Sequence, residues 1–146
     1  MTDFDLGTFL PYQLAVIASR VSREFAELYM REAGLSIPEW RVIAHLSQQG
    51  EVSVREIHRQ VDMDKSKVSR AAARLEERGL VVKAEHASDK RLVSLTLTEA
   101  GLDVMNRIIP LARDYERALI ARLPQAMRDD LRPLLAAMMD PPDDSV

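Results

Sequence analysis

Apolar residues recur every three or four positions near the start of the chain, which predicts an amphipathic helix over residues 14–29. The stripe consists of Leu14, Ile17, Ala18, Val21, Phe25, Leu28 and Tyr29. Gly34 is placed to end this helix. Ser36-Ile37-Pro38-Glu39 has the pattern of a capping box and predicts a second helix that runs to about Ser47.

Two further helix starts follow a turn at residues 48–51. Ser53-Val54-Arg55-Glu56 is a second capping-box pattern, for a short helix ending near Val61. The run 62–64 supplies an N-cap for a helix that extends to Arg78 and is closed by Gly79. Its apolar positions form one narrow stripe: Val68, Ala71, Ala72 and Leu75.

Beyond Gly79 the period changes to two, and residues 80–85 and 92–97 read as strands joined by a polar tip at 86–91. Thr98 caps a long helix whose stripe is Gly101, Val104, Ile108, Leu111, Tyr115 and Leu119. Pro110 is expected to kink this helix without ending it. A last helix, disturbed by Pro133, is expected around residues 127–138, with apolar positions Met127, Leu131, Leu134 and Met138.

The order of these elements predicts a mostly α fold with a small β-hairpin wing, which is the α+β arrangement of a winged helix-turn-helix. The DNA-binding domain is assigned to residues 36–97. Residues 1–35 and 98–146 are assigned to a helical dimerisation region, because their apolar stripes are more extensive than a small winged core needs.

Composition narrows the function classes. The 146 residues are 47% apolar and 29% charged, as expected of one globular domain, and the net charge of −3 excludes a coat protein held on DNA by bulk positive charge. The absence of cysteine excludes disulfides, thiolate zinc sites and thiol redox sensing. No apolar run is long enough for a membrane span and the N-terminus is acidic, so a cytoplasmic protein is expected.

Charge is unevenly distributed along the chain. Residues 65–91 contain eight basic and four acidic side chains, a local charge of +4 that leaves −7 for the remainder. The basic ones are Lys65, Lys67, Arg70, Arg74, Arg78, Lys83, Lys90 and Arg91. This segregation favours a surface that faces a polyanion.

The solvent face of the 64–78 helix carries the residue types that read the major groove. Arg70 and Arg74 suit guanine edges or phosphates, and Ala73 is small enough to let the backbone approach the bases. Lys65, Ser66, Lys67 and Ser69 reach phosphates or bases near the helix N-terminus. The alternative is an ordinary solvated face with Arg/Glu pairs.

The hairpin tip adds a second candidate contact. Lys90 and Arg91 are suited to probe a minor groove or phosphates, and Asp89 either holds Arg91 in one rotamer or initiates the turn. The alternative is a charged tip that serves solubility.

Several motifs in this order resemble the MarR family of transcriptional regulators. The runs 64–70 and 75–81 resemble its recognition helix, Asp89-Lys90-Arg91 resembles its D-x-R wing, and residues 95–101 contain its L-T-x-x-G signature. The resemblance covers nearly the whole chain. The departures are Lys90, where arginine is commoner, and the two prolines of the C-terminal helices.

The resemblance implies a homodimer that binds double-stranded DNA, with the N- and C-terminal helices interlocked, and that acts as a repressor. A two-fold dimer presents recognition helices about 34 Å apart, which matches a palindromic operator. The alternative is a monomer in which both terminal helices fold back on one core.

The resemblance also implies a small-molecule effector, often an aromatic carboxylate. Arg20 and Trp40-Arg41 are candidates to supply guanidinium groups and an aromatic wall. Alternatively, Trp40 is plain core and the arginines are solvated or pair with Glu24 or Glu39.

Neither a metal nor a cofactor is expected. His45, His58 and His86 have no recognisable ligand spacing, and His58 is interpreted as a satisfied core histidine. The chain lacks phosphate-loop, H-E-x-x-H and G-x-S-x-G motifs, so it is not expected to be an enzyme. The rival interpretation is a winged helix used for protein contact without DNA binding, which would not need Arg70, Arg74 and Arg91 to project together.

Overall fold

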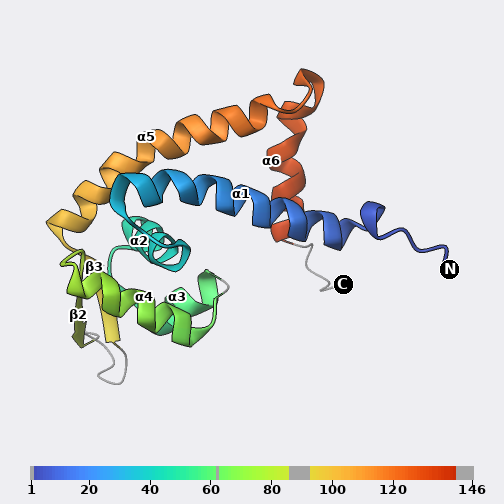
Figure 1. Ribbon diagram of the computed structural model, residues 1–146. Helices are drawn as coiled ribbons and strands as arrows, with labels where there is room; N and C mark the ends of the chain where they lie inside the picture. Colours follow the sequence, from blue (N-terminus) through green and yellow to red (C-terminus); the bar gives the residue numbers. More distant parts are fainter. Residues whose placement is uncertain (1, 62, 86–92, 141–146) are drawn as a thin grey trace. The chain divides into compact units, whose positions relative to one another are not determined.

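The computed structural model describes residues 2–61, 63–85 and 93–140 (Figure 1). It divides into two compact units, residues 1–111 and 112–146. The elements in chain order are η1 (Leu6–Thr8), α1 (Leu10–Ala33), α2 (Ile37–Gln49), β1 (Val52–Ser53), α3 (Val54–Gln60), α4 (Lys65–Glu77), β2 (Val81–Glu85), β3 (Val93–Leu97), α5 (Glu99–Ala121) and α6 (Gln125–Met139). The expected mostly α fold with a small sheet is confirmed.

The observed ends of the first two helices agree with the sequence where a capping residue marks them. Helix α1 begins at Leu10, four residues earlier than predicted. Its N-cap Phe9 makes no side-chain hydrogen bond, so the sequence has no polar capping residue to mark this start, and Pro11 in the first turn is compatible with it. Gly34 ends it with φ of 64°, as predicted. The capping box at the start of α2 is also confirmed: the Glu39 N–H donates to the Ser36 hydroxyl, and the Ser36 N–H donates to the Glu39 carboxylate, both at 3.3 Å.

The second capping box is only half formed. The Glu56 N–H donates to the Ser53 hydroxyl at 3.1 Å, but the Glu56 carboxylate accepts from that hydroxyl and not from the backbone N–H. Val52 and Ser53 form a short strand opposite Leu95 and Ser94. The predicted two-stranded hairpin is therefore part of a three-stranded sheet, and β1 was missed because two residues are too short to show a period.

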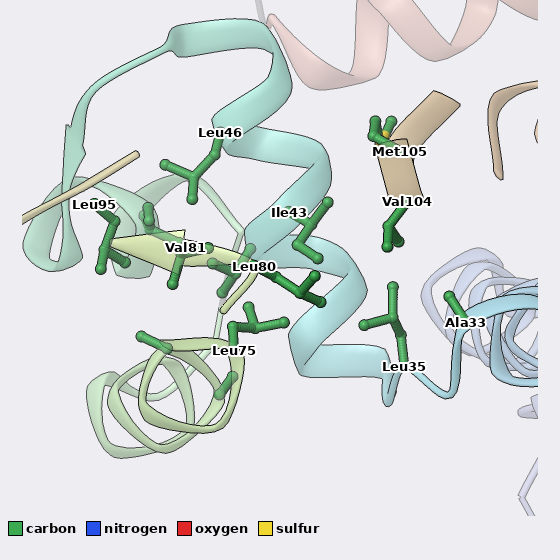
Figure 2. Close-up of a cluster of buried hydrophobic side chains, with 14 of the residues drawn as sticks. Ala33, Leu35, Ile43, Leu46, Leu75, Leu80, Val81, Leu95, Val104 and Met105 are labelled. Atoms are coloured by element: carbon green, nitrogen blue, oxygen red, sulfur yellow. The ribbon is translucent and has the colours of Figure 1, made fainter. Parts of the chain in front are cut away.

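The sheet has the antiparallel order β1-β3-β2. Strands β2 and β3 pair from Val81 opposite Leu97 to Glu85 opposite Val93, close to the predicted ranges. Figure 2 shows Leu75 of α4 beneath the strand residues Val81 and Leu95, with Ile43 and Leu46 of α2 beside them. The predicted stripe of α4 is confirmed, because Val68, Ala71, Ala72 and Leu75 are all fully buried.

The start of α5 is packed closely against the start of β2. The Thr98 hydroxyl accepts from the Gly101 N–H at 3.1 Å and donates to the Gly79 carbonyl at 2.6 Å, and the Thr98 N–H donates to the Leu80 carbonyl at 3.0 Å. A Cβ atom on Gly101 would lie 2.2 Å from the Leu80 oxygen. The Thr-x-x-Gly spacing therefore lets the first turn of α5 pack directly against the backbone at Leu80.

The two C-terminal helices, α5 and α6, continue past their internal prolines. Helix α5 runs through Pro110 to Ala121, as expected, and α6 runs through Pro133 to Met139. His58 is half-buried, so its expected place in the core is wrong, but its Nδ1 atom contacts the Met63 carbonyl and the ring therefore has the polar partner that was expected.

Candidate nucleic-acid interface

One face of α4 is exposed along its whole length. Every residue that the sequence placed there is exposed: Lys65, Ser66, Lys67, Ser69, Arg70, Ala73 and Arg74. The opposite stripe is anchored in the core, so the exposed face is fixed in direction. All seven side chains are thus accessible to a ligand, and their contact with DNA stays a prediction.

The N-terminal end of this face is positive. Asp64 occupies the N-cap position of α4, but its side chain makes no capping hydrogen bond, in contrast to the cap expected from the sequence. Within the described parts of the chain, no carboxylate lies within ion-pair distance of Lys65, Lys67 or Arg70. These cations and the free N–H groups of a helix start suit a phosphate group.

The other end of α4 is tied to the protein body by a charged cluster. The Glu39 side chain, 8% exposed, places Oε1 3.7 Å from Nε of Arg74 and Oε2 3.8 Å from Nη1 of Arg78. Arg78 also donates to the carbonyls of Ala33 and Gly34, at 2.6 and 3.2 Å. We call Glu39, Arg74 and Arg78 the Glu39 cluster.

The cluster changes how the basic segment is interpreted. Arg78 binds the last carbonyl groups of α1, and Lys83 pairs with Glu76 at 3.9 Å. With Arg74, three of the basic residues counted in the segment therefore have partners within the fold. Sequence reasoning missed the role of Glu39, because its position in the capping box already accounted for a glutamate there.

The wing residues Asp89, Lys90 and Arg91 lie outside the described residues. Their predicted contact with DNA stays a prediction.

The candidate effector residues lie in two separate places: Trp40 and Arg41 on α2, and Arg20 on α1. Trp40 stacks on Tyr29 with ring centroids 5.3 Å apart and meets Phe25 edge-on at 5.2 Å. The Arg41 guanidinium donates to the Ser22 hydroxyl at 3.5 Å. Burial raises the pKa of Tyr29 to about 12, and the positive charge of Arg41 opposes this shift.

Arg20 lies elsewhere on α1. It is exposed and lines a hollow of about 390 Å³ whose other walls all come from residues 7–17. The structure does not place Trp40 or Arg41 in that hollow. Trp40 packs against the core, as the alternative interpretation held, whereas Glu39 pairs with Arg74 and Arg78 and not with Arg41.

His45 is a further candidate that sequence reasoning did not select. Its Nε2 atom is buried and has no hydrogen-bond partner in the described structure. It follows Arg41 by four residues, so both side chains lie on the same side of α2. This spacing was visible in the sequence, but the burial of the ring nitrogen was not.

The described residues contain neither a cluster suited to a metal ion nor a helix suited to a membrane span. No group of three His, Asp or Glu side chains in residues 2–61, 63–85 and 93–140 is arranged to hold a metal ion. None of the helices placed there is both long and apolar enough to cross a membrane.

Comparison with known proteins gives concordant results. A sequence profile described as MarR family matches residues 33–92. The transcriptional repressor IacR of Pseudomonas putida is 28% identical over 133 residues, which is 91% of this chain and 79% of IacR. BpsR of Bordetella bronchiseptica, whose DNA binding is regulated by 6-hydroxynicotinic acid, superimposes with a TM-score of 0.81 at 22% identity, covering 97% of this chain and 100% of BpsR. A MarR/EmrR family regulator from Acinetobacter sp. ADP1 has a TM-score of 0.80 at 27% identity, covering 93% of this chain and 96% of that one.

Proposed function

Because the chain belongs to the MarR family of transcriptional regulators and is not an enzyme, we propose that it is a cytoplasmic homodimeric repressor that binds a palindromic operator. The observation that carries the proposal is the exposed basic face of α4, held in direction by a fully buried opposite stripe. A small aromatic carboxylate releases the protein from DNA.

The α4 face supplies two kinds of contact. Lys65 and Lys67 at the helix start neutralise phosphates, which fixes the position of the helix on the duplex. Arg70 lies one turn further, where a guanidinium group reads guanine in the major groove, and Ala73 leaves room for close approach. The wing residues Lys90 and Arg91 are proposed to contact the flanking minor groove or phosphates, with Asp89 orienting Arg91.

Exposed apolar residues support the dimer. Leu10, Leu14 and Ile17 of α1 are exposed, and so are Met127 and Leu134 of α6. Apolar surface of this extent on terminal helices favours a protein partner, and a second copy of the chain is the simplest one.

Selection of the preferred duplex from a random pool tests this function. We expect an inverted repeat with half-sites about one helical turn apart, bound by two chains per duplex in sedimentation analysis. A monomer at micromolar concentration would contradict the dimer. Absence of sequence-preferring binding at ~100 mM salt, where several phosphate contacts still register, would contradict the regulator and favour a protein-contact module.

Arg70→Ala tests the recognition helix in the same assay. Loss of a base-reading arginine is expected to cost ~1–3 kcal/mol, or about 5- to 150-fold in affinity, and to relax specificity at one position. Arg107→Ala is the matched control, because Arg107 lies on α5 and pairs with Glu32 at 3.8 Å. Equal losses in the two variants would show only a general charge effect.

The effector is proposed to bind where α2 faces α1. Arg41 offers a guanidinium group to a carboxylate, Trp40 contributes an aromatic wall, and the unpartnered Nε2 of His45 suits a second polar group of the ligand. Arg20 stays a separate candidate, because its hollow is lined by residues 7–17.

Release of the selected duplex by aromatic acids tests this site, with 6-hydroxynicotinic acid as the first probe because it regulates BpsR. Arg41→Ala is expected to raise the concentration needed for release at least about tenfold, as loss of a charged hydrogen bond does. Arg20→Ala distinguishes the two candidate places. A larger effect of Arg20→Ala would move the site to the hollow on α1, and equal release from wild type and Arg41→Ala would exclude Arg41.

A further inference from the structure

The Glu39 carboxylate faces Arg74 of α4 and Arg78, the residue that caps the C-terminus of this helix. Its two oxygens lie 3.7 Å from Nε of Arg74 and 3.8 Å from Nη1 of Arg78. Both separations exceed hydrogen-bond length, so the attraction between the side chains is coulombic.

Arg78 has other partners that fix it, and they belong to the protein body. Its guanidinium group donates to the carbonyls of Ala33 and Gly34 at the end of α1. Arg74, by contrast, has a side chain that is 51% exposed, and it lies one turn after Arg70 on the same face of α4. Arg74 is therefore the member of the cluster that is free to move toward a ligand.

We propose that Glu39 is the counter-ion of Arg74 in the unbound protein, and that Arg74 exchanges this carboxylate for a DNA phosphate when α4 enters the major groove. The proposal rests on the proposed function, because it requires DNA binding through α4. Arg78 stays beside Glu39 during the exchange, so the buried carboxylate is not left without a cation. Glu39 is thus a positioning residue that lowers DNA affinity by competing with phosphate.

The size of the effect follows from the exposure of Arg74. Breaking an ion pair that has one half-exposed partner shifts an equilibrium by about 1.4- to 5-fold. Glu39→Gln removes the charge but keeps the side-chain oxygen that accepts from the Ser36 N–H, so the capping box at α2 is preserved.

A double-mutant cycle on duplex affinity tests the exchange. Glu39→Gln is expected to tighten binding about 1.4- to 5-fold in the wild-type background and to have no effect in the Arg74→Ala background. The slope of log affinity against log salt stays unchanged, because the number of neutralised phosphates is the same. Glu39→Asp, which keeps the charge but withdraws it from Arg74, is expected to shift affinity in the same direction by less.

Controls separate the other outcomes. Glu77→Gln removes one negative charge from α4 outside the Glu39 cluster, and urea unfolding verifies that each variant is folded. Weaker binding by Glu39→Gln would mean that the pair persists on DNA, and equal tightening with and without Arg74 would mean a general field effect; each overturns the exchange. Wild type that fails to bind any duplex would overturn the proposed function instead.

Discussion

Gly101→Ala is expected to destabilise residues 1–111 by about 3 kcal/mol, at the upper end of overpacking costs. The added Cβ would lie 2.2 Å from the Leu80 oxygen and 3.2 Å from the Leu80 carbonyl carbon. A backbone group cannot rotate away as a side chain can. Helix α5 must therefore shift, which strains the hydrogen bonds of Thr98 to Gly79 and Leu80.

Urea unfolding measures this cost. Gly7→Ala is the matched control, because a Cβ atom there would meet only the Asp5 carboxylate, at 3.3 Å. The midpoint for Gly101→Ala is expected to fall well below that of Gly7→Ala, with a similar slope. A wild-type midpoint for Gly101→Ala would show that the contact between α5 and β2 relaxes at no cost.

Local patterns account for much of the fold. The stripe of α4 and the glycine that ends α1 were predicted because helix period and capping depend on residues within one or two turns. The contact between Gly101 and Leu80 joins residues far apart in the sequence, so it could not be predicted from local patterns. The sequence marked Gly101 only as part of the L-T-x-x-G signature. Strand β1 was missed for a related reason, since its pairing with Leu95 is entirely non-local.

The candidate site shows the same division. Periodicity placed the α4 face correctly, because the solvent face of a helix follows from its buried stripe. Periodicity could not show that Arg78, at the C-cap of α4, has a different role from the arginines within the helix. Arg78 was counted with the cations of the basic segment, whereas its partners are Ala33, Gly34 and Glu39, all more than 35 positions earlier in the chain.

Arg78→Ala is accordingly expected to lower the free energy of unfolding by about 1.5–3 kcal/mol, the range for hydrogen bonds to a charged group. The substitution removes the donors that satisfy the last carbonyls of α1 and one of two cations beside the buried Glu39 carboxylate. The side chain is 41% exposed, and Arg74 remains near Glu39, which together keep the cost below that of stranding a buried charge.

Arg74→Ala and Arg117→Ala make this expectation specific in urea unfolding. Arg117 pairs with Asp114 on the exposed surface of α5, so its loss is expected to change stability by less than about 0.5 kcal/mol. Arg74→Ala is expected to cost below about 1 kcal/mol, while it weakens duplex binding. Arg78→Ala is expected to show the reverse, a large loss of stability with near-normal affinity of the folded fraction. Equal stability losses at Arg74 and Arg78 would contradict the different roles assigned to these two arginines. Those roles require that only Arg78 be fixed to the end of α1.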